Sequence, residues 1–120
     1  MVLFRFLLAT LFIIVFVYAC LVGANHGWDI LPVFLGDIVA MTWPGQFNLD
    51  FSSYLILSGI WLSWRHNFSV LGLFLGLTAA LCGILFLSPY LLVASFQTNG
   101  NIDALLIGVK RAGTLQIRKN

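Results

Sequence analysis

Hydrophobic residues run along this chain in long blocks that short polar stretches interrupt. Residues 6–25 and 67–101 contain no charged side chain, and each block reaches the about 20 residues that an α-helix needs to cross the hydrocarbon core of a bilayer. Another apolar block lies between them, after the polar residues of "PGQFNLD". This pattern predicts three transmembrane helices, over about residues 3–24, 48–65 and 70–95.

The two later spans are expected to pack on each other. Only a few residues separate 48–65 from 70–95, which predicts an antiparallel helical hairpin. The second span is close to the shortest length that crosses a bilayer, so it should stand nearly upright. Pro89 lies in the final third of 70–95, where the loss of one backbone hydrogen bond is expected to kink the helix.

Two further segments have the pattern of short amphipathic helices. Residues 28–42 are interrupted by Asp, Pro and Gly, yet their apolar residues recur at near-helical spacing, which predicts a helix in the headgroup region. The tail, 96–120, contains "IDALLIGVKRAG", with Asn101 as cap before it and Gly113 at its end. The predicted fold is an all-α integral membrane protein of one domain, 1–120. It has three transmembrane helices, an interfacial amphipathic helix between the first and the second, and a short C-terminal amphipathic helix.

The composition supports a membrane protein. Hydrophobic residues make up 61% of the chain and charged residues 8%, whereas soluble domains contain roughly half and a quarter. The net charge of +2 comes from scattered basic residues, which gives no indication of a nucleic-acid partner. Cys20 and Cys82 lie in apolar runs and are expected to be buried thiols, not parts of a disulfide framework. Arg5 and the apolar run after it imitate a signal peptide, but the length of the run favours an uncleaved first span.

The distribution of Lys and Arg gives conflicting evidence on orientation. With the N-terminus inside, Arg5 and Arg65 face the cytoplasm, and the acidic loop 25–48, which has no Lys or Arg, faces out. A third span would then place the basic residues of the tail outside, against the positive-inside rule. Because these residues lie far from the span and the first helix usually dominates, we expect a cytoplasmic N-terminus.

Asp50 is the acidic residue nearest to a predicted membrane-spanning core. An ionisable side chain at membrane depth is a candidate proton or ligand site. Asn48, however, fits a helix N-cap, and Asp50 would then lie in the first turn, where its charge stabilises the helix dipole by about 0.3–1 kcal/mol. We therefore expect Pro44 and Gly45 to turn the chain and Asp50 to be structural.

Aromatic and basic residues near the ends of the second span are weak candidates for binding a lipid or a quinone. These are Trp43, Trp64, Arg65 and His66. Tryptophans and a snorkelling arginine commonly fix the depth of a helix without any ligand. His26 and His66 are expected on opposite membrane faces, which excludes a shared metal site. No catalytic motif or phosphate-binding loop is present. The sequence thus predicts neither an enzyme nor a required cofactor or metal, although a bound lipid, quinone or carotenoid fits the aromatic content.

Six small residues lie at helical spacing on the second and third spans. They are Gly59, Ser63, Gly72, Gly76, Ala80 and Gly83. Faces of small residues let helix backbones approach closely in lipid. The two faces either pack against each other within the hairpin or leave one of them for the helix of another protein.

Several short stretches resemble those of a known group of proteins. An aspartate opens the second span in "NLDF", a Trp-Arg closes it in "WLSWRHNF", the third span is rich in glycine, and "FLSPYLL" follows. Over residues 3–95 they are similar to an uncharacterised family of small bacterial inner-membrane proteins with three to four transmembrane helices. The resemblance implies a place in the bacterial inner (cytoplasmic) membrane and transfers no activity.

Three functions fit these observations. The chain lacks catalytic residues, and its first span is apolar on all faces. We therefore expect a non-catalytic accessory subunit that packs against a larger membrane complex of the respiratory or photosynthetic type, and against lipids. A small homo-oligomeric transporter or channel is the first alternative, although the membrane-embedded glutamate and the Pro-Gln signature of transporters of this size are missing. A subunit that binds a quinone, carotenoid or lipid is the second.

Overall fold

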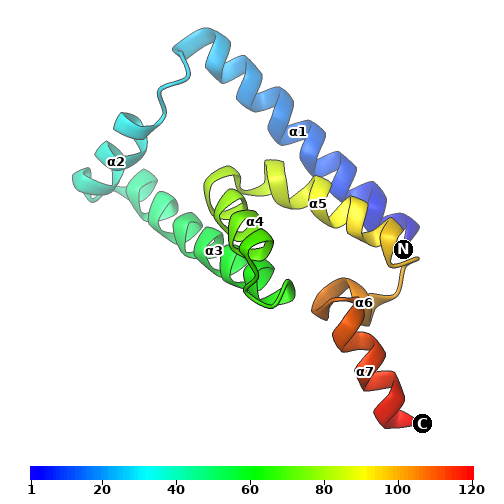
Figure 1. Ribbon diagram of the computed structural model, residues 1–120. Helices are drawn as coiled ribbons and strands as arrows, with labels where there is room; N and C mark the ends of the chain where they lie inside the picture. Colours follow the sequence, from blue (N-terminus) through cyan, green and yellow to red (C-terminus); the bar gives the residue numbers. More distant parts are fainter.

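Seven α-helices and no β-strand form the protein in the computed structural model, which describes residues 1–120 (Figure 1). The helices are α1 (Val2–His26), α2 (Leu31–Ala40), α3 (Trp43–Arg65), α4 (Val70–Cys82), α5 (Ile84–Gln97), α6 (Ile102–Ile107) and α7 (Val109–Lys119). The predicted all-α fold is confirmed. α1 is the one helix that is both long and apolar enough to cross a membrane, and it coincides with the first predicted span.

Two pairs of helices and one sharp turn organise the fold. α3 packs along α4, and α1 packs along α5, as Figure 1 shows. The turn at Gly83 joins α4 to α5. Because Ser69, just before α4, and Thr98, just after α5, line the same pocket, the two helices form a V with Gly83 at its apex. α6 lies at the open base of this V, where its carbonyl oxygens accept hydrogen bonds from Trp61 and Arg65 of α3.

The continuous helix predicted over residues 70–95 is wrong, because the chain breaks at Gly83. Gly83 has φ 60° and ψ −137°, a conformation that residues with a side chain rarely adopt. The two helices have 13 and 14 residues. Each is about 20 Å long, which is shorter than the about 30 Å hydrocarbon core of a bilayer. Pro89 lies inside α5, so the glycine and not the proline interrupts this segment.

The start of α3 also differs from the prediction. The helix begins at Trp43, because Pro44 fits the first helical turn, where its missing N–H group is not needed. Asn48 is therefore not an N-cap, and its side-chain amide donates a hydrogen bond to the carbonyl oxygen of Phe34 in α2 (3.2 Å). Asp50 is exposed and lies about two turns inside the helix. The expected place of Asp50 in the first turn, next to the positive end of the helix dipole, is wrong.

The C-terminal tail forms two short helices instead of one. The side-chain oxygen of Asn101 accepts a hydrogen bond from the Ala104 N–H group (3.0 Å), as expected for the N-cap of α6. The chain then breaks at Gly108, where φ is 91°. Gly113 lies within α7 and does not end it. Basic and apolar residues up to Lys119 therefore share one amphipathic helix.

Small residues hold α3 and α4 together. A Cβ atom on Gly59 would lie 2.8 Å from the Gly76 carbonyl oxygen and 3.4 Å from the Ala80 side chain. The Ser63 hydroxyl donates a hydrogen bond to the carbonyl oxygen of Gly72 (3.1 Å). The structure thus brings five of the six small residues into one contact, and the sixth lies at the apex of the V. Since α3 covers the small-residue face of α4, that face is closed to a foreign helix.

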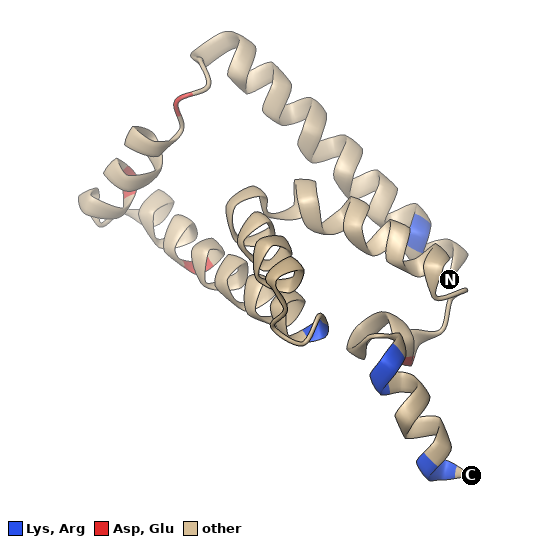
Figure 2. Cartoon of the chain, viewed as in Figure 1, with Lys and Arg blue, Asp and Glu red and all other residues tan.

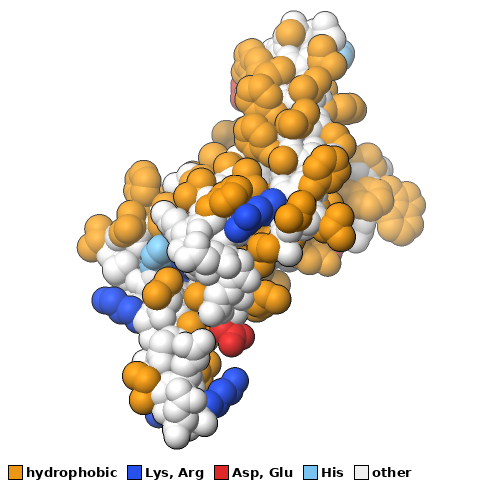
Figure 3. Space-filling view, turned by 90° about the vertical axis from the view of Figure 1, so that its right-hand side faces the viewer, with side chains coloured by type: hydrophobic (Ala, Val, Ile, Leu, Met, Phe, Trp, Pro, Cys, Tyr) orange, Lys and Arg blue, Asp and Glu red, His pale blue; other side chains and the backbone are white.

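The chain leaves most of its apolar side chains uncovered. Of the 120 residues, 17 are buried, and the accessible surface is 8737 Å², compared with about 6,500 Å² for a compact soluble monomer of this mass. Figure 3 shows hydrophobic side chains over most of the upper part of one face, with basic side chains from its middle downward. The expected burial of Cys20 and Cys82 is wrong, since Cys82 is exposed and Cys20 is half-buried. Another molecule or an apolar medium has to cover this surface.

Gly76→Ala tests the packing of α3 on α4. A Cβ at position 76 would overlap the Ser63 hydroxyl and the Gly59 carbonyl oxygen, and overpacking of this kind typically costs about 1–3 kcal/mol. We expect a lower midpoint of thermal unfolding, measured by circular dichroism in detergent. Gly113→Ala is the control, because a Cβ there meets nothing within 4 Å and alanine favours the helix. Two variants of equal stability would show that the backbones do not approach closely here.

Candidate functional site

Basic residues gather at one end of the molecule. Figure 2 shows Lys and Arg near the N-terminus of α1, at the end of α3 and along α7. Three of the four acidic residues lie between the end of α1 and the middle of α3. The turn at Gly83 is responsible for this separation, because it brings the tail back to the end where Arg5 and Arg65 lie.

Arg65, the last residue of α3, connects three helices. Its Nε donates a hydrogen bond to the Leu105 carbonyl oxygen (2.7 Å) and its Nη2 to that of Ala104 (3.2 Å), both in α6. Its Nη1 donates to the Tyr90 hydroxyl of α5 (2.7 Å). A cation near the carbonyl end of a helix is stabilised by the helix dipole. Arg65 is therefore an internal clamp at the base of the V.

Tyr90 extends this contact to His66. The Tyr90 hydroxyl accepts a hydrogen bond from Arg65, and a second hydrogen bond joins it to Nε2 of His66 (2.6 Å). Which of the two groups donates depends on the tautomer of the ring. Burial lowers the pKa of His66, and the nearby Arg65 charge lowers it further. The fold therefore favours the neutral form of His66.

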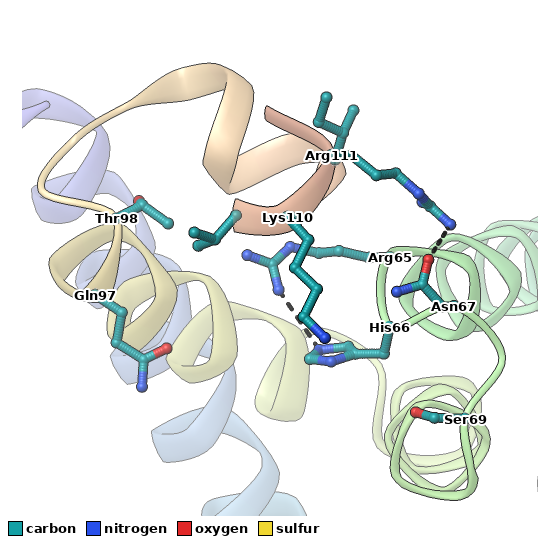
Figure 4. A pocket seen from close by; sticks show the side chains of 11 residues that line it. Arg65, His66, Asn67, Ser69, Gln97, Thr98, Lys110 and Arg111 are labelled. Atoms are coloured by element: carbon teal, nitrogen blue, oxygen red, sulfur yellow. Dashed lines mark hydrogen bonds between the residues drawn. The ribbon is translucent and has the colours of Figure 1, made fainter. Parts of the chain in front are cut away.

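A pocket of about 470 Å³ opens beside this clamp (Figure 4). It lies between the loop after α3, the end of α5 and the start of α7. Its eleven lining residues include three cations and no carboxylate. Figure 4 shows the Lys110 side chain reaching from α7 toward His66. The charged and polar lining residues are Arg65, His66, Asn67, Ser69, Gln97, Thr98, Lys110 and Arg111.

Arg111 lies at the rim of this pocket and has an incomplete set of partners. Its guanidinium stacks on the Trp64 ring, 4.1 Å from the ring centroid, and its Nη2 donates a hydrogen bond to the side-chain oxygen of Asn67 (2.6 Å). Its Nη1 is buried without a hydrogen-bond partner. A buried charged donor without an acceptor costs free energy, so Arg111 is the least satisfied side chain of the site.

The four lipid or quinone candidates predicted from the sequence do not form one site. Trp64, Arg65 and His66 lie together at the base of the V. Trp43 begins α3 at its other end, about 32 Å away along the helix axis. The tryptophan is 74% exposed there. A single ligand of the size of a headgroup therefore cannot contact both places.

A second cavity, of about 330 Å³, lies between α2, α3 and the end of α4. Eight of its nine lining residues are hydrophobic, and the ninth is Ser52. The Ser52 hydroxyl already donates a hydrogen bond to the Asn48 carbonyl oxygen (2.7 Å). This cavity offers apolar contact but little means of recognising a polar headgroup.

Sequence reasoning missed the basic pocket because its residues come from distant parts of the chain. Tyr90 is 25 positions from Arg65, and Arg111 is 44 positions from Asn67. The hydroxyl of a tyrosine in an apolar helix needs a hydrogen-bond partner. This was the one feature of the sequence that indicated a polar contact of Tyr90. The predicted continuous third span placed the tail on the opposite side of the membrane from Arg65. Lys110 was therefore not expected to line a pocket with Arg65 and His66.

No protein-family model, curated protein or solved structure matches the chain. The resemblance to small bacterial inner-membrane proteins therefore stays a prediction. In chemical terms, the base of the V offers positive charge and hydrogen-bond donors, which suit an anion. Its one imidazole is engaged by Tyr90.

The stability of the protein is expected to depend on pH through His66. The folded state lowers the pKa of this ring below the ordinary 6.5, so the unfolded chain binds more protons just below that pH. The stabilisation is complete above pH 6.5 and is lost as the pH falls through the lowered pKa. Thermal unfolding in a neutral detergent, between about pH 5.5 and 7.5, measures this effect.

His66→Gln should abolish this dependence, because glutamine does not titrate. His26→Gln is the matched control and should retain it, since His26 ends α1 at the other end of the molecule. A pH dependence that persists in His66→Gln would belong to another group.

Proposed function

We propose that this protein is a non-catalytic accessory subunit, embedded in a membrane by several helices, that packs against a larger membrane protein complex. The observation that supports this is the uncovered apolar surface of its longest helices. Ile14 and Tyr18 of α1 are 60% and 72% exposed, and Ile60 of α3 is 54% exposed. The resemblance noted in the sequence supports the bacterial inner membrane as the location.

The arrangement of the helices favours a protein partner in addition to lipid. α1 packs on α5 and α3 packs on α4, but α1 and α3 share no packed interface. The end of α1 and the start of α3 extend past the apex of the V at Gly83, and no helix of this chain lies between them there (Figure 1). Helices of another protein would give this surface fitted packing, which is the main attraction between helices in lipid.

We infer a membrane topology from the separation of charge. α1 and α3 are about 37 and 34 Å long, a length sufficient to cross a bilayer, and α1 alone is also apolar enough. α4 and α5 would enter from the basic end and return to it without crossing. Both termini would then lie on the basic side, which the positive-inside rule assigns to the cytoplasm. In this topology the basic residues of the tail join Arg5 and Arg65, and the conflict found in the sequence disappears.

Cysteine labelling in intact cells tests this topology. In a background with Cys20→Ala and Cys82→Ala, Gln46→Cys should react with a membrane-impermeant maleimide added outside, because it lies in the segment without Lys or Arg. Gly113→Cys should react only after permeabilisation. Labelling of Gly113→Cys from outside would show that the segment 70–95 crosses the membrane and would contradict the proposed topology.

The proposed function predicts a stoichiometric complex. Purification in mild detergent, followed by a native mass measurement, should give a particle much heavier than the 13.3 kDa chain, with a larger membrane protein in a fixed ratio. A discrete homo-oligomer would contradict the proposal and favour the transporter or channel. A chain isolated with lipid alone would also contradict it.

A further inference from the structure

The basic pocket at the base of the V has more positive charge than the protein compensates. Arg65, Lys110 and Arg111 line it together with His66, and no carboxylate is among the lining residues. The hydrogen bonds of both arginines go to neutral oxygens or to the neutral ring. Arg65 and Arg111 are half-buried and Lys110 is exposed, and like charges that line one pocket repel one another. An anion in the pocket would remove this repulsion.

Hydrogen-bond donors without protein partners surround the same space. Nη1 of Arg111 has no hydrogen-bond partner, and because neighbouring atoms cover it, an anion reaches it only when the side chain moves. The N–H groups of Val109 and Lys110 open α7, a helix of 11 residues, and no carbonyl oxygen outside that helix accepts from them. The Ser69 hydroxyl accepts from the Gly72 N–H group (3.1 Å), so its own proton is free to donate. Cationic side chains next to the positive end of a helix are a common setting for a phosphate.

We propose that this pocket binds a phosphate group carried by the headgroup of an anionic phospholipid. Lys110 and Arg111 hold the phosphate oxygens by charge-assisted hydrogen bonds, and His66 contacts the group from the facing wall (Figure 4). Arg65 stays in its role as clamp, because its donors are used by α6 and Tyr90. The volume of about 470 Å³ leaves room for the glycerol that adjoins the phosphate.

The surroundings of the pocket favour a lipid over free phosphate. In the proposed topology the pocket lies where headgroups meet acyl chains. Phe68 and Val109 adjoin it and are 54% and 64% exposed, so acyl chains find apolar contacts next to the phosphate. Arg118 and Lys119 at the end of α7 attract an anionic membrane surface. The inference rests on the proposed membrane location and not on a partner complex.

Native mass spectrometry of the full chain, released from nanodiscs, measures this binding. From nanodiscs of phosphatidylcholine and phosphatidylglycerol, the unmodified chain should retain one phosphatidylglycerol. The variant Lys110→Gln/Arg111→Gln should retain at least about tenfold less phosphatidylglycerol. The reason is that one charge-assisted hydrogen bond contributes a factor of about ten or more to the affinity. The control Arg118→Gln/Lys119→Gln removes the same charge from the same helix outside the pocket. The amount of phosphatidylglycerol that this control retains should change by less than about twofold. The reason is that Arg118 and Lys119 attract only the bilayer surface, which is lost when the chain leaves the nanodisc.

Four outcomes would overturn the inference. An equal loss in both double variants would show general attraction of α7 to anionic lipid. Equal retention of phosphatidylcholine would show that the charge is not recognised. Inorganic phosphate that binds as tightly as the lipid, and displaces it, would identify a site for free phosphate. A chain that inserts with the proposed topology but retains no phosphatidylglycerol refutes this inference and leaves the topology intact.

A second measurement uses the unmodified chain, so its result does not depend on whether the double variant folds. In nanodiscs with phosphatidylglycerol the pKa of His66, followed by NMR of the labelled imidazole, should be higher than in phosphatidylcholine alone. The reason is that an anion beside the ring favours its protonated form. The His26 signal, from the other end of α1, is the internal reference. A pKa of His66 that is the same in both lipids would contradict binding of the phosphate in this pocket.

Discussion

The hydrogen bonds of Arg65 connect parts of the fold that would otherwise be nearly independent. One guanidinium at the end of α3 reaches two carbonyl oxygens of α6 and the hydroxyl of Tyr90 in α5. Hydrogen bonds from a charged donor are each worth about 1.5–3 kcal/mol. At the same end, Arg5 of α1 donates to the Ser95 hydroxyl and carbonyl oxygen (3.0 and 2.8 Å). Without these contacts, the turn at Gly83 would be the main link between the two helix pairs.

The same interactions explain why this end of the molecule is suited to an anion. Both clamping arginines use neutral acceptors, so their positive charges are not cancelled within the protein. The return of α5 adds Lys110 and Arg111 to the pocket that His66 lines, and burial lowers the pKa of His66. Elsewhere, many large apolar side chains of α1, α3 and α4 are exposed. The fold thus separates two parts of the molecule. One is a long apolar part, which needs lipid or a partner, and the other is the positively charged end at the base of the V.

Local sequence patterns were sufficient for the features that depend on near neighbours. The apolar run of α1 predicted a helix long enough to cross a membrane, and the structure has it. Asn101 predicted the start of α6, because its side chain reaches the Ala104 N–H group only three positions on. The spacing of Gly72 and Gly76 predicted a face without side chains, and the structure packs that face against α3. Pro44 was misread, since proline suits a turn and the first turn of a helix equally well.

The sequence alone thus determined the helical class, the first long helix and the small-residue faces, because 3.6-residue periodicity and capping are local properties. Only the tertiary structure decided that Gly83 ends one helix and starts another. A glycine in an apolar run is compatible with both choices. The outcome depends on whether α5 gains more by packing on α1 and by offering Tyr90 to Arg65 than by continuing α4. That comparison involves residues far apart in the chain, and on it depend the side to which the tail returns and the existence of the basic pocket.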